Sequence, residues 1–341
     1  MALPALLARL TCREYKNWMK AGMCLEMLHS RLHGYIDREM QMFHRLLSQH
    51  IPAPGQRRRC QCRARGKQFE PGCSVCAQWK ELILSHHNNR NGEIYWGNSD
   101  PSMWPTHYWE VAKVYMPRGQ TQYRRPKQSD ATALLNLLNN CNYFNIQNTS
   151  RVREIIKCRN ELMHSCNMKV SSTWLEAFGK KMHDLISEFT HVPGLVKEGE
   201  KMQEVLLSDW KVEDLGICDV DGIPKAQSGI ELQSATIYTR LLPYDVERRM
   251  IEQMIQELSL EIVERGSLTK EDEDKVCKIR NFLSQNEDLR IVFQEDLQWL
   301  DCLSKNNFAP NAERIFTEKF ARYFLFCLMV ILAAFIVGEI Y

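Results

Sequence analysis

Apolar residues recur at intervals of three and four along most of the chain, which places them on one face of an α-helix. This pattern predicts helices within 6–48, where Leu25, Leu28 and Leu32 share a face and Gly34 marks a break. Further helices are expected over 77–87, 109–115, 130–140, 151–164 and 173–189. In the last of these, Thr173 and Glu176 form a capping box, and Pro193 follows its end.

The chain changes in character after residue 207. Residues 208–240 have no helical period and contain many Asp and Gly residues, which is typical of a linker. Beyond them we expect three amphipathic acidic helices, the second of which begins at Thr269. No alternation of apolar and polar residues indicates a ladder of strands. The sequence therefore predicts a mainly α protein.

An uncharged apolar run, Tyr323–Gly338, lies near the end of the chain. At about 1.5 Å per residue it spans roughly 24 Å, or roughly 28 Å with Phe320 and Ala321, against a hydrocarbon core of about 30 Å. Arg322 and the preceding Lys319 would keep the N-terminal side in the cytosol. We expect a single-pass tail anchor in the lipid bilayer over 320–338, facing the cytosol, with the endoplasmic reticulum favoured over the outer mitochondrial membrane. A buried core helix is the alternative.

The formal net charge of +2 conceals an asymmetry between the two halves of the chain. Residues 1–130 contain 20 Lys and Arg against 10 Asp and Glu, whereas residues 191–341 contain 17 against 27. The basic half indicates a polyanionic partner. A hydrophobic content of 44% is enough for a real core, and it excludes a disordered protein.

Four of the 13 cysteines lie in two close pairs. Cys60 and Cys62 form a C-x-C pair, and Cys73 and Cys76 form a C-x-x-C pair. No secretory signal opens the chain, so the thiols are expected to be reduced. At this spacing four thiolates suit a structural zinc ion, which would hold a loop rich in proline and glycine. A disordered basic loop with incidental cysteines is the alternative. Two further candidate ligands follow one helix later, His86 and His87.

Two polar loops supply most of the positive charge of the first half. Their candidate RNA-binding residues are Arg57, Arg58, Arg59, Arg63, Arg65 and Lys67 in the first loop, and Arg124, Arg125 and Lys127 in the second. Such side chains contact phosphates, and Tyr123 and the nearby tryptophans would stack on bases. A solvated run of charge, or attraction to an anionic membrane surface, is the alternative.

One predicted helix carries residues suited to RNA cleavage without a metal. Asn160 and His164 are four residues apart, hence neighbours on one helical face, and Arg159 precedes them. An Arg supplies a permanent cation for a phosphate, a His exchanges protons near neutral pH, and an Asn orients the ring or a 2′-hydroxyl. Two copies facing one another in a homodimer would complete such a site. From the residues alone, a polar network within a bundle is the alternative.

The Arg159-x4-His164 string resembles the R-x4–6-H motif of HEPN domains. The flanking segments match the HEPN subgroup found in an RNA-binding ubiquitin ligase of vertebrates, and they are Asp130-x-x-x-Leu134-Leu135, Ile155-Ile156-Lys157 and Ser165-x-x-Met168-Lys169. More broadly, the chain resembles an uncharacterised vertebrate family named after an X-chromosome open reading frame. That resemblance rests on Glu14-Tyr15-Lys16-Asn17-Trp18, Trp96-Gly97-Asn98, Trp104-Pro105 and Trp109-Glu110-Val111-Ala112-Lys113.

The HEPN resemblance implies a helical bundle that commonly dimerises and that binds RNA or, in some members, cleaves it. We assign 1–195 to a HEPN-like domain with a Cys- and Trp-rich insertion over 50–129 and a candidate zinc loop over 57–80. A linker over 196–240 and an acidic helical or coiled-coil region over 241–305 follow. The leading hypothesis is a membrane-tethered protein that binds RNA. Whether a dimer of this protein also cleaves the RNA is left open by the sequence. The alternative is a non-catalytic adaptor that dimerises through the bundle and binds an unknown protein through the acidic helices.

Overall fold

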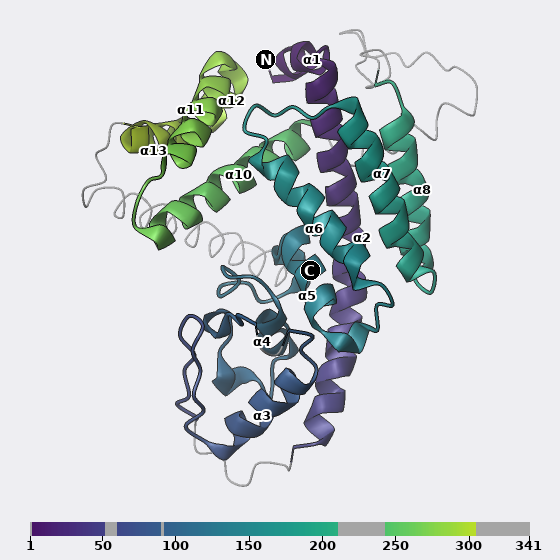
Figure 1. Ribbon diagram of the computed structural model, residues 1–341, viewed down its shortest axis with the longest axis vertical. Helices are drawn as coiled ribbons and strands as arrows, with labels where there is room; N and C mark the ends of the chain where they lie inside the picture. Colours follow the sequence, from purple (N-terminus) through teal and green to yellow (C-terminus); the bar gives the residue numbers. More distant parts are fainter. Residues whose placement is uncertain (1, 52–59, 90–91, 211–242, 305–341) are drawn as a thin grey trace, which may run out of the picture. The chain divides into compact units, whose positions relative to one another are not determined.

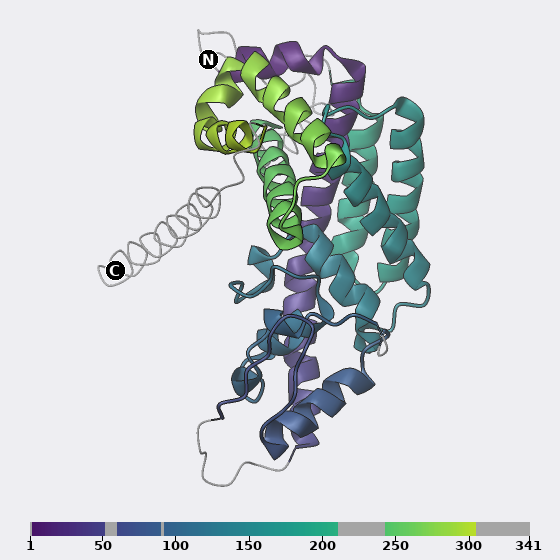
Figure 2. The same ribbon diagram turned by 60° about the vertical axis from the view of Figure 1, so that its left-hand side comes forward.

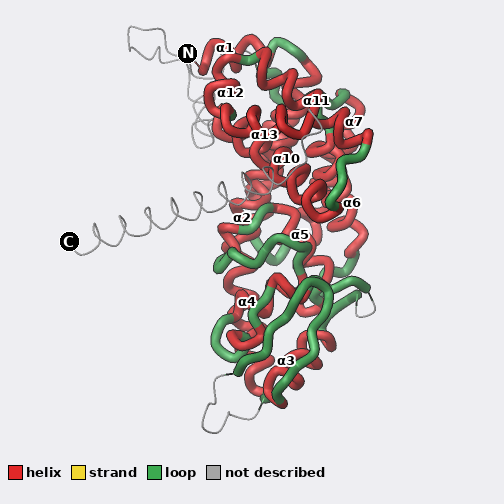
Figure 3. The backbone as a smooth tube through the Cα atoms, turned by 90° about the vertical axis from the view of Figure 1, so that its left-hand side faces the viewer, coloured by secondary structure: helices red, strands yellow, loops and turns green. Residues whose placement is uncertain are grey.

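The computed structural model describes residues 2–51, 60–89, 92–210 and 243–304 (Figure 1). Helices joined by loops make up these residues, and the only β-pairing among them consists of two isolated bridges (Figure 3). The mainly α prediction is therefore confirmed. The chain divides into two compact units. We call them the α2 unit (13–162 and 170–246) and the α10 unit (1–12, 163–169 and 247–341).

The α2 unit is built on one long helix, α2 (Arg13–Gln49). Trp18, Ile36 and Phe43 on this helix are fully buried, and burial of each such side chain stabilises the fold by about 1.5–3 kcal/mol. The other helices pack around α2 (Figure 2). The longer ones are α5 (Ala131–Asn140), α6 (Thr149–His164), α7 (Ser172–Ile186) and α8 (Pro193–Leu207). Short 3₁₀ turns follow α5 and α7, at η5 (Asn142–Phe144) and η6 (Ser187–Phe189).

Most predicted helices of this unit are confirmed, but their ends differ in three places. The predicted break at Gly34 is wrong, because buried Leu32 and Ile36 anchor α2 on either side of it, and the chain breaks instead after Leu10. The N-cap of α7 is Ser171, whose hydroxyl accepts the Trp174 N–H, and not Thr173.

Part of the predicted linker is also helical. Residues 196–207 belong to α8, which begins at Pro193 and packs on α2 and α7. Proline fits the first helical position because its missing N–H would have no partner there, so Pro193 starts a helix as well as following one. Leu195, Met202 and Val205 form the buried face of α8. The linker residues 211–240 lie outside the described residues.

The Cys- and Trp-rich insertion forms a loop-rich part of the α2 unit, and we call its described residues between 60 and 129 the cysteine module (Figure 3). Its elements are α3 (Ser74–Ser85), η1 (Trp96–Asn98), η2 (Pro101–Met103), α4 (Tyr108–Ala112), η3 (Lys113–Tyr115) and η4 (Pro126–Gln128). Aromatic rings form its core: Phe69 lies 5.5 Å from Trp96 and 5.3 Å from Trp104, between ring centroids. Trp79 stacks on His44 of α2 at 5.3 Å.

The α10 unit joins the N-terminal helix to the acidic helices. It contains α1 (Ala2–Leu10), α10 (Pro243–Arg265), α11 (Lys270–Gln285), α12 (Glu287–Val292) and α13 (Gln294–Ser304). Arg9 at the end of α1 lies 2.7 Å from Glu247 and 2.9 Å from Asp288, and both carboxylates are buried. The three predicted acidic helices are confirmed, with the third divided into α12 and α13, and Thr269 caps α11 as expected.

The predicted tail anchor, Tyr323–Gly338, lies outside the described residues. Among the helices that the structure describes, none has the length and apolar character needed to cross a bilayer.

Candidate metal centre and basic surface

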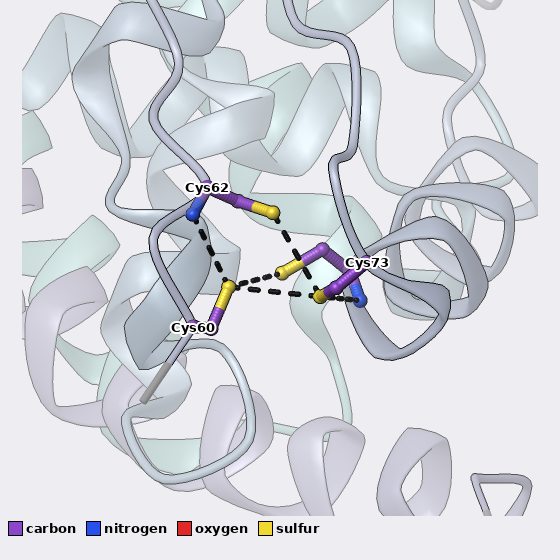
Figure 4. A group of neighbouring side chains, drawn as sticks. Cys60, Cys62 and Cys73 are labelled. Carbon is purple, nitrogen blue, oxygen red and sulfur yellow. Dashed lines mark hydrogen bonds between the residues drawn. The ribbon is translucent and has the colours of Figure 1, made fainter. Parts of the chain in front are cut away.

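The four cysteines singled out in the sequence come together in the cysteine module. The Sγ atoms of Cys60, Cys62, Cys73 and Cys76 all lie within 4.8 Å of one another (Figure 4). The Sγ of Cys60 is 3.3 Å from that of Cys76 and 3.6 Å from that of Cys73. None of the four forms a disulfide bond. This cluster has the composition and size needed to hold a metal ion.

The separations between the sulfur atoms fit one tetrahedral ion. With Zn–S bonds of about 2.3 Å, two sulfurs of a tetrahedron lie about 3.8 Å apart. The Sγ of Cys62 is 3.7 Å from that of Cys73, and the separations in the cluster, from 3.3 Å to at most 4.8 Å, lie within about 1 Å of the tetrahedral value. The other candidates, His86 and His87, are not in the cluster: the ring of His86 faces Asn142, and His87 is buried against Tyr115.

Backbone N–H groups donate to three of the sulfurs, and the pKa of Cys73 is lowered, whereas burial raises the pKa of the Cys60 and Cys76 thiols. The N–H of Cys62 donates to the Sγ of Cys60 at 3.3 Å, and the N–H of Gly72 to the Sγ of Cys62 at 3.2 Å. Cys73 is the N-cap of α3, where its Sγ accepts the N–H of Cys76. Burial alone would raise the pKa of the Cys73 thiol, but this N–H and the neighbouring thiols hold the pKa below its usual value. Thiolates are the form that binds metal.

The part of the first basic loop that follows Cys62 lies between the two cysteine pairs and folds into a tight turn. Arg65 and Gln68 exchange backbone hydrogen bonds of 3.1 and 2.9 Å, with Gly66 at a φ of +52°. The side chains of Arg63 and Arg65 are exposed. Lys67 pairs with Glu93 at 2.7 Å in an exposed ion pair, which contributes little to stability. The remaining predicted RNA-binding residues of this loop, Arg57, Arg58 and Arg59, lie outside the described residues.

Gly97 joins the two basic loops, which are more than fifty residues apart in the sequence. Its N–H donates to the carbonyl of Gly66 in the first loop at 2.8 Å, and its carbonyl accepts the hydroxyl of Thr121 in the second loop at 3.2 Å. A Cβ at Gly97 would lie 2.7 Å from the backbone nitrogen of Gly66, which leaves no room for another residue type. The buried side chain of Asn98 bonds Pro117 and Gln120 of the second loop as well.

A buried carboxylate holds the second basic loop in place. Glu110 is 2% exposed and pairs with Lys113 at 2.8 Å and with Arg124 at 2.7 Å. Burial lowers the pKa of Lys113, and its partner Glu110 opposes that shift. Arg124 therefore has a structural role, although its side chain is 65% exposed. The other two predicted residues, Arg125 and Lys127, are exposed on either side of Pro126.

The tryptophans expected to stack on bases are not available for that role. Trp96, Trp104 and Trp109 are at most 6% exposed, and Trp104 donates its indole N–H to Ser99 inside the module. Tyr123 is half-buried. The exposed surface of the two loops therefore offers cations in preference to aromatic rings.

The structure places the Arg-x4-His residues in different environments on α6. Arg159 is buried, and its guanidinium lies 3.1 Å from the carboxylate of Asp130. The same carboxylate caps α5 by accepting the N–H of Ala133 at 2.8 Å. Asn160 and His164 are exposed, and His164 falls within the α10 unit. Arg159 is thus bound to a helix cap inside the α2 unit and is not exposed beside Asn160.

Reasoning from sequence missed the residues that assemble the basic surface. Gly97, Glu110 and Lys113 are each involved in contacts between distant segments, so their roles carry no local signal. The segments that contain them, Trp96-Gly97-Asn98 and Trp109-Glu110-Val111-Ala112-Lys113, were singled out only for their resemblance to an uncharacterised family, which gives them no role.

Comparison with known proteins gives the family but no activity. Residues 9–307 match the model of a domain of unknown function, DUF4559. The chain is 42% identical over 309 residues to the mouse "Uncharacterized protein CXorf38 homolog", covering 89% of this chain and 93% of that protein. No solved structure matches the chain. The chain therefore belongs to the DUF4559 family, together with that CXorf38 homologue.

Proposed function

We propose that the chain is an RNA-binding protein whose cysteine module, held by one structural zinc ion, presents a basic surface made of two loops. The junction at Gly97 is the observation that carries this proposal, because it places two separately predicted basic loops side by side. The convergence of Cys60, Cys62, Cys73 and Cys76 supports zinc, since four thiolates in a closed site are typical of structural zinc centres.

The chemistry of the surface favours contact with the phosphate backbone. Arg63, Arg65, Arg125 and Lys127 are exposed cations, whereas Trp96, Trp104 and Trp109 of the same module are buried. Binding through phosphates releases counterions, so the affinity depends steeply on salt and weakly on base sequence.

Binding, in preference to cleavage, is the function that we propose. Cleavage by the Arg-x4-His residues needs a cation that reaches the scissile phosphate. The pairing of Arg159 with Asp130 supports a structural role for this guanidinium instead. Ribonuclease activity stays a prediction of the HEPN resemblance. It is tested by RNA cleavage with the wild type against His164→Ala, and cleavage that this substitution leaves intact would refute a role for His164.

We also propose that the apolar run Tyr323–Gly338 tethers this activity to a membrane. Its length and its flanking cations support a single span with the rest of the chain in the cytosol. Carbonate extraction of the full chain tests the tether: the protein should stay in the membrane pellet, and its release would contradict the proposal.

The RNA-binding proposal is tested with the full chain in detergent micelles and a fluorescent single-stranded RNA. Replacing Arg63 and Arg65 by Ala should lower the affinity about tenfold at an ionic strength of about 0.15 M. It should also reduce the slope of log K against log salt by about 1.4, because each phosphate contact on a single strand contributes about 0.7.

The matched control replaces two exposed cations outside α6, Lys180 of α7 and Lys197 of α8, by Ala. This pair should leave the affinity within about twofold of the wild type, since neither residue lies in the basic loops. Equal losses in both variants would mean that RNA responds only to net charge, which contradicts a defined surface. If the wild type fails to bind at all, the non-catalytic adaptor is the remaining hypothesis.

A further inference from the structure

The second basic loop runs along one polar face of α2. The ring nitrogen Nε2 of His29 lies 2.7 Å from the carbonyl oxygen of Ser129. One helical turn further along, His33 is close enough to Lys127 for the two charges to interact. The rings of His29 and His33 are 5.7 Å apart. Two half-buried imidazoles and one exposed ammonium group therefore share a small area of surface.

The next turn of α2 carries the acidic neighbour of this area. The carboxylate of Asp37 accepts the hydroxyl of Tyr108 and the amide of Gln41. Arg125 of the loop is close enough to Tyr108 for their charges to interact. The loop therefore runs antiparallel to α2, with Lys127 beside His33 and Arg125 near the level of Asp37. Because Asp37 is hydrogen-bonded on both oxygens, its charge is partly shared with these donors.

We propose that His29 and His33 extend the RNA-binding surface onto α2 and, with Lys127, contact a backbone phosphate in a complex that takes up a proton. This inference rests on the proposed RNA binding and names residues that the charge pattern alone would not select. The Nε2–H of His29 donates to the carbonyl oxygen of Ser129. A phosphate oxygen between the two rings therefore accepts the Nδ1–H of a charged His29 and a ring N–H of a charged His33, while Lys127 supplies a permanent charge.

Proton uptake follows from the surroundings of His33. Burial lowers the pKa of His33, the charges of His29 and Lys127 lower it further, and Asp37 opposes them. In the free protein at neutral pH the ring of His33 is therefore mostly neutral. A bound phosphate favours the charged ring and raises the pKa, so RNA binds more tightly as the pH falls.

The experiment measures RNA affinity of the full chain between about pH 8 and pH 6. If binding raises the pKa of His33 by about one unit, wild-type affinity rises roughly three- to fivefold over this range, because the full tenfold is reached only well below the pKa of the free ring. His33→Gln should bind more weakly at pH 6 and lose the part of this rise that belongs to His33. His33→Lys, with a fixed charge, should recover the affinity and show a smaller rise than the wild type, the remainder coming from His29. The matched control is His183→Gln, an exposed histidine of α7, which should behave like the wild type.

A second readout separates this inference from the RNA-binding proposal. Histidine-selective NMR of the same variants is recorded during titration with inorganic tripolyphosphate. Wild-type affinity and pH dependence retained in His33→Gln would overturn the inference while leaving RNA binding intact. If the wild type binds no RNA, the proposed function fails, and the inference holds only if tripolyphosphate shifts the ring signals that His33→Gln removes. Absence of any such shift then overturns it.

Discussion

Replacement of Cys76 by Ser is the perturbation with the most clearly defined consequence. Cys76 is 1% exposed and is the first buried residue of α3. Its Sγ lies 3.6 Å from the carbonyl oxygen of Pro101. A serine hydroxyl is a poor zinc ligand at neutral pH, so the variant should lose the ion. The aromatic core of the cysteine module then loses the cross-link that holds its two ends together.

The magnitude follows from the loop that the ion closes. The four ligands span residues 60–76, and a cross-link that closes a loop of about 15 residues contributes about 3 kcal/mol. For a unit of roughly 150–250 residues, each kcal/mol shifts Tm by about 2–4 °C. We therefore expect Cys76→Ser to lower Tm by roughly 6–12 °C relative to a control that buries the same hydroxyl elsewhere.

Cys141→Ser provides that control, because Cys141 is also 1% exposed but lies outside the thiol cluster. The assay combines elemental analysis of the purified full chain with a thermal melt followed by tryptophan fluorescence, since Trp79 and Trp104 lie in the same module. One zinc per chain is expected in the wild type and in the control. Chelation should lower the wild-type Tm as Cys76→Ser does. A wild type that is metal-free, with the same Tm before and after chelation, would refute the reasoning.

Three further predictions concern other parts of the chain. Gly97→Ala should weaken RNA binding and lower stability, because its Cβ would meet the backbone of Gly66 at 2.7 Å; unchanged affinity would contradict the role given to the junction. Arg9→Met should cost about 3–5 kcal/mol in urea unfolding, because two buried carboxylates lose their cation, and a loss below about 1 kcal/mol would contradict this. Burial lowers the pKa of His87 to about 4. Its contribution to the free energy of unfolding is therefore complete above the pKa of about 6.5 in the unfolded chain, and it is lost as the pH falls towards 4. The free energy of unfolding should fall by about 3 kcal/mol over this range, and His87→Asn should remove this pH dependence. Urea unfolding that shows the same pH dependence in His87→Asn would contradict the prediction.

Local signals in the sequence predicted the helices well. The apolar spacing in 130–140 and 151–164 corresponds closely to α5 and α6, and Thr269 caps α11 as its pattern indicated. These features depend on neighbours within a few residues, which is the range that a periodic pattern records. The start of α8 at Pro193 was missed because proline can both follow one helix and begin the next.

The parts of the site that could not be predicted from the sequence depend on contacts between residues that are far apart along the chain. The spacing of the cysteines sufficed to predict their cluster, because the two pairs are separated by a short loop. In contrast, Arg159 meets Asp130 across 29 positions, and nothing near Arg159 distinguishes a helix-capping partner from a phosphate ligand. The junction between Gly66 and Gly97 is likewise formed by backbone atoms, which residue types do not reveal.

The central claim is that a zinc-held cysteine module binds RNA. The most direct measurement is the affinity of the full chain for single-stranded RNA, at an ionic strength of about 0.15 M, with zinc bound and after its removal by a chelator. The account predicts that removal lowers the affinity about tenfold and that added zinc restores it, since the ion holds the turn that carries Arg65. Equal affinity in the two states, or no binding in either, would contradict it.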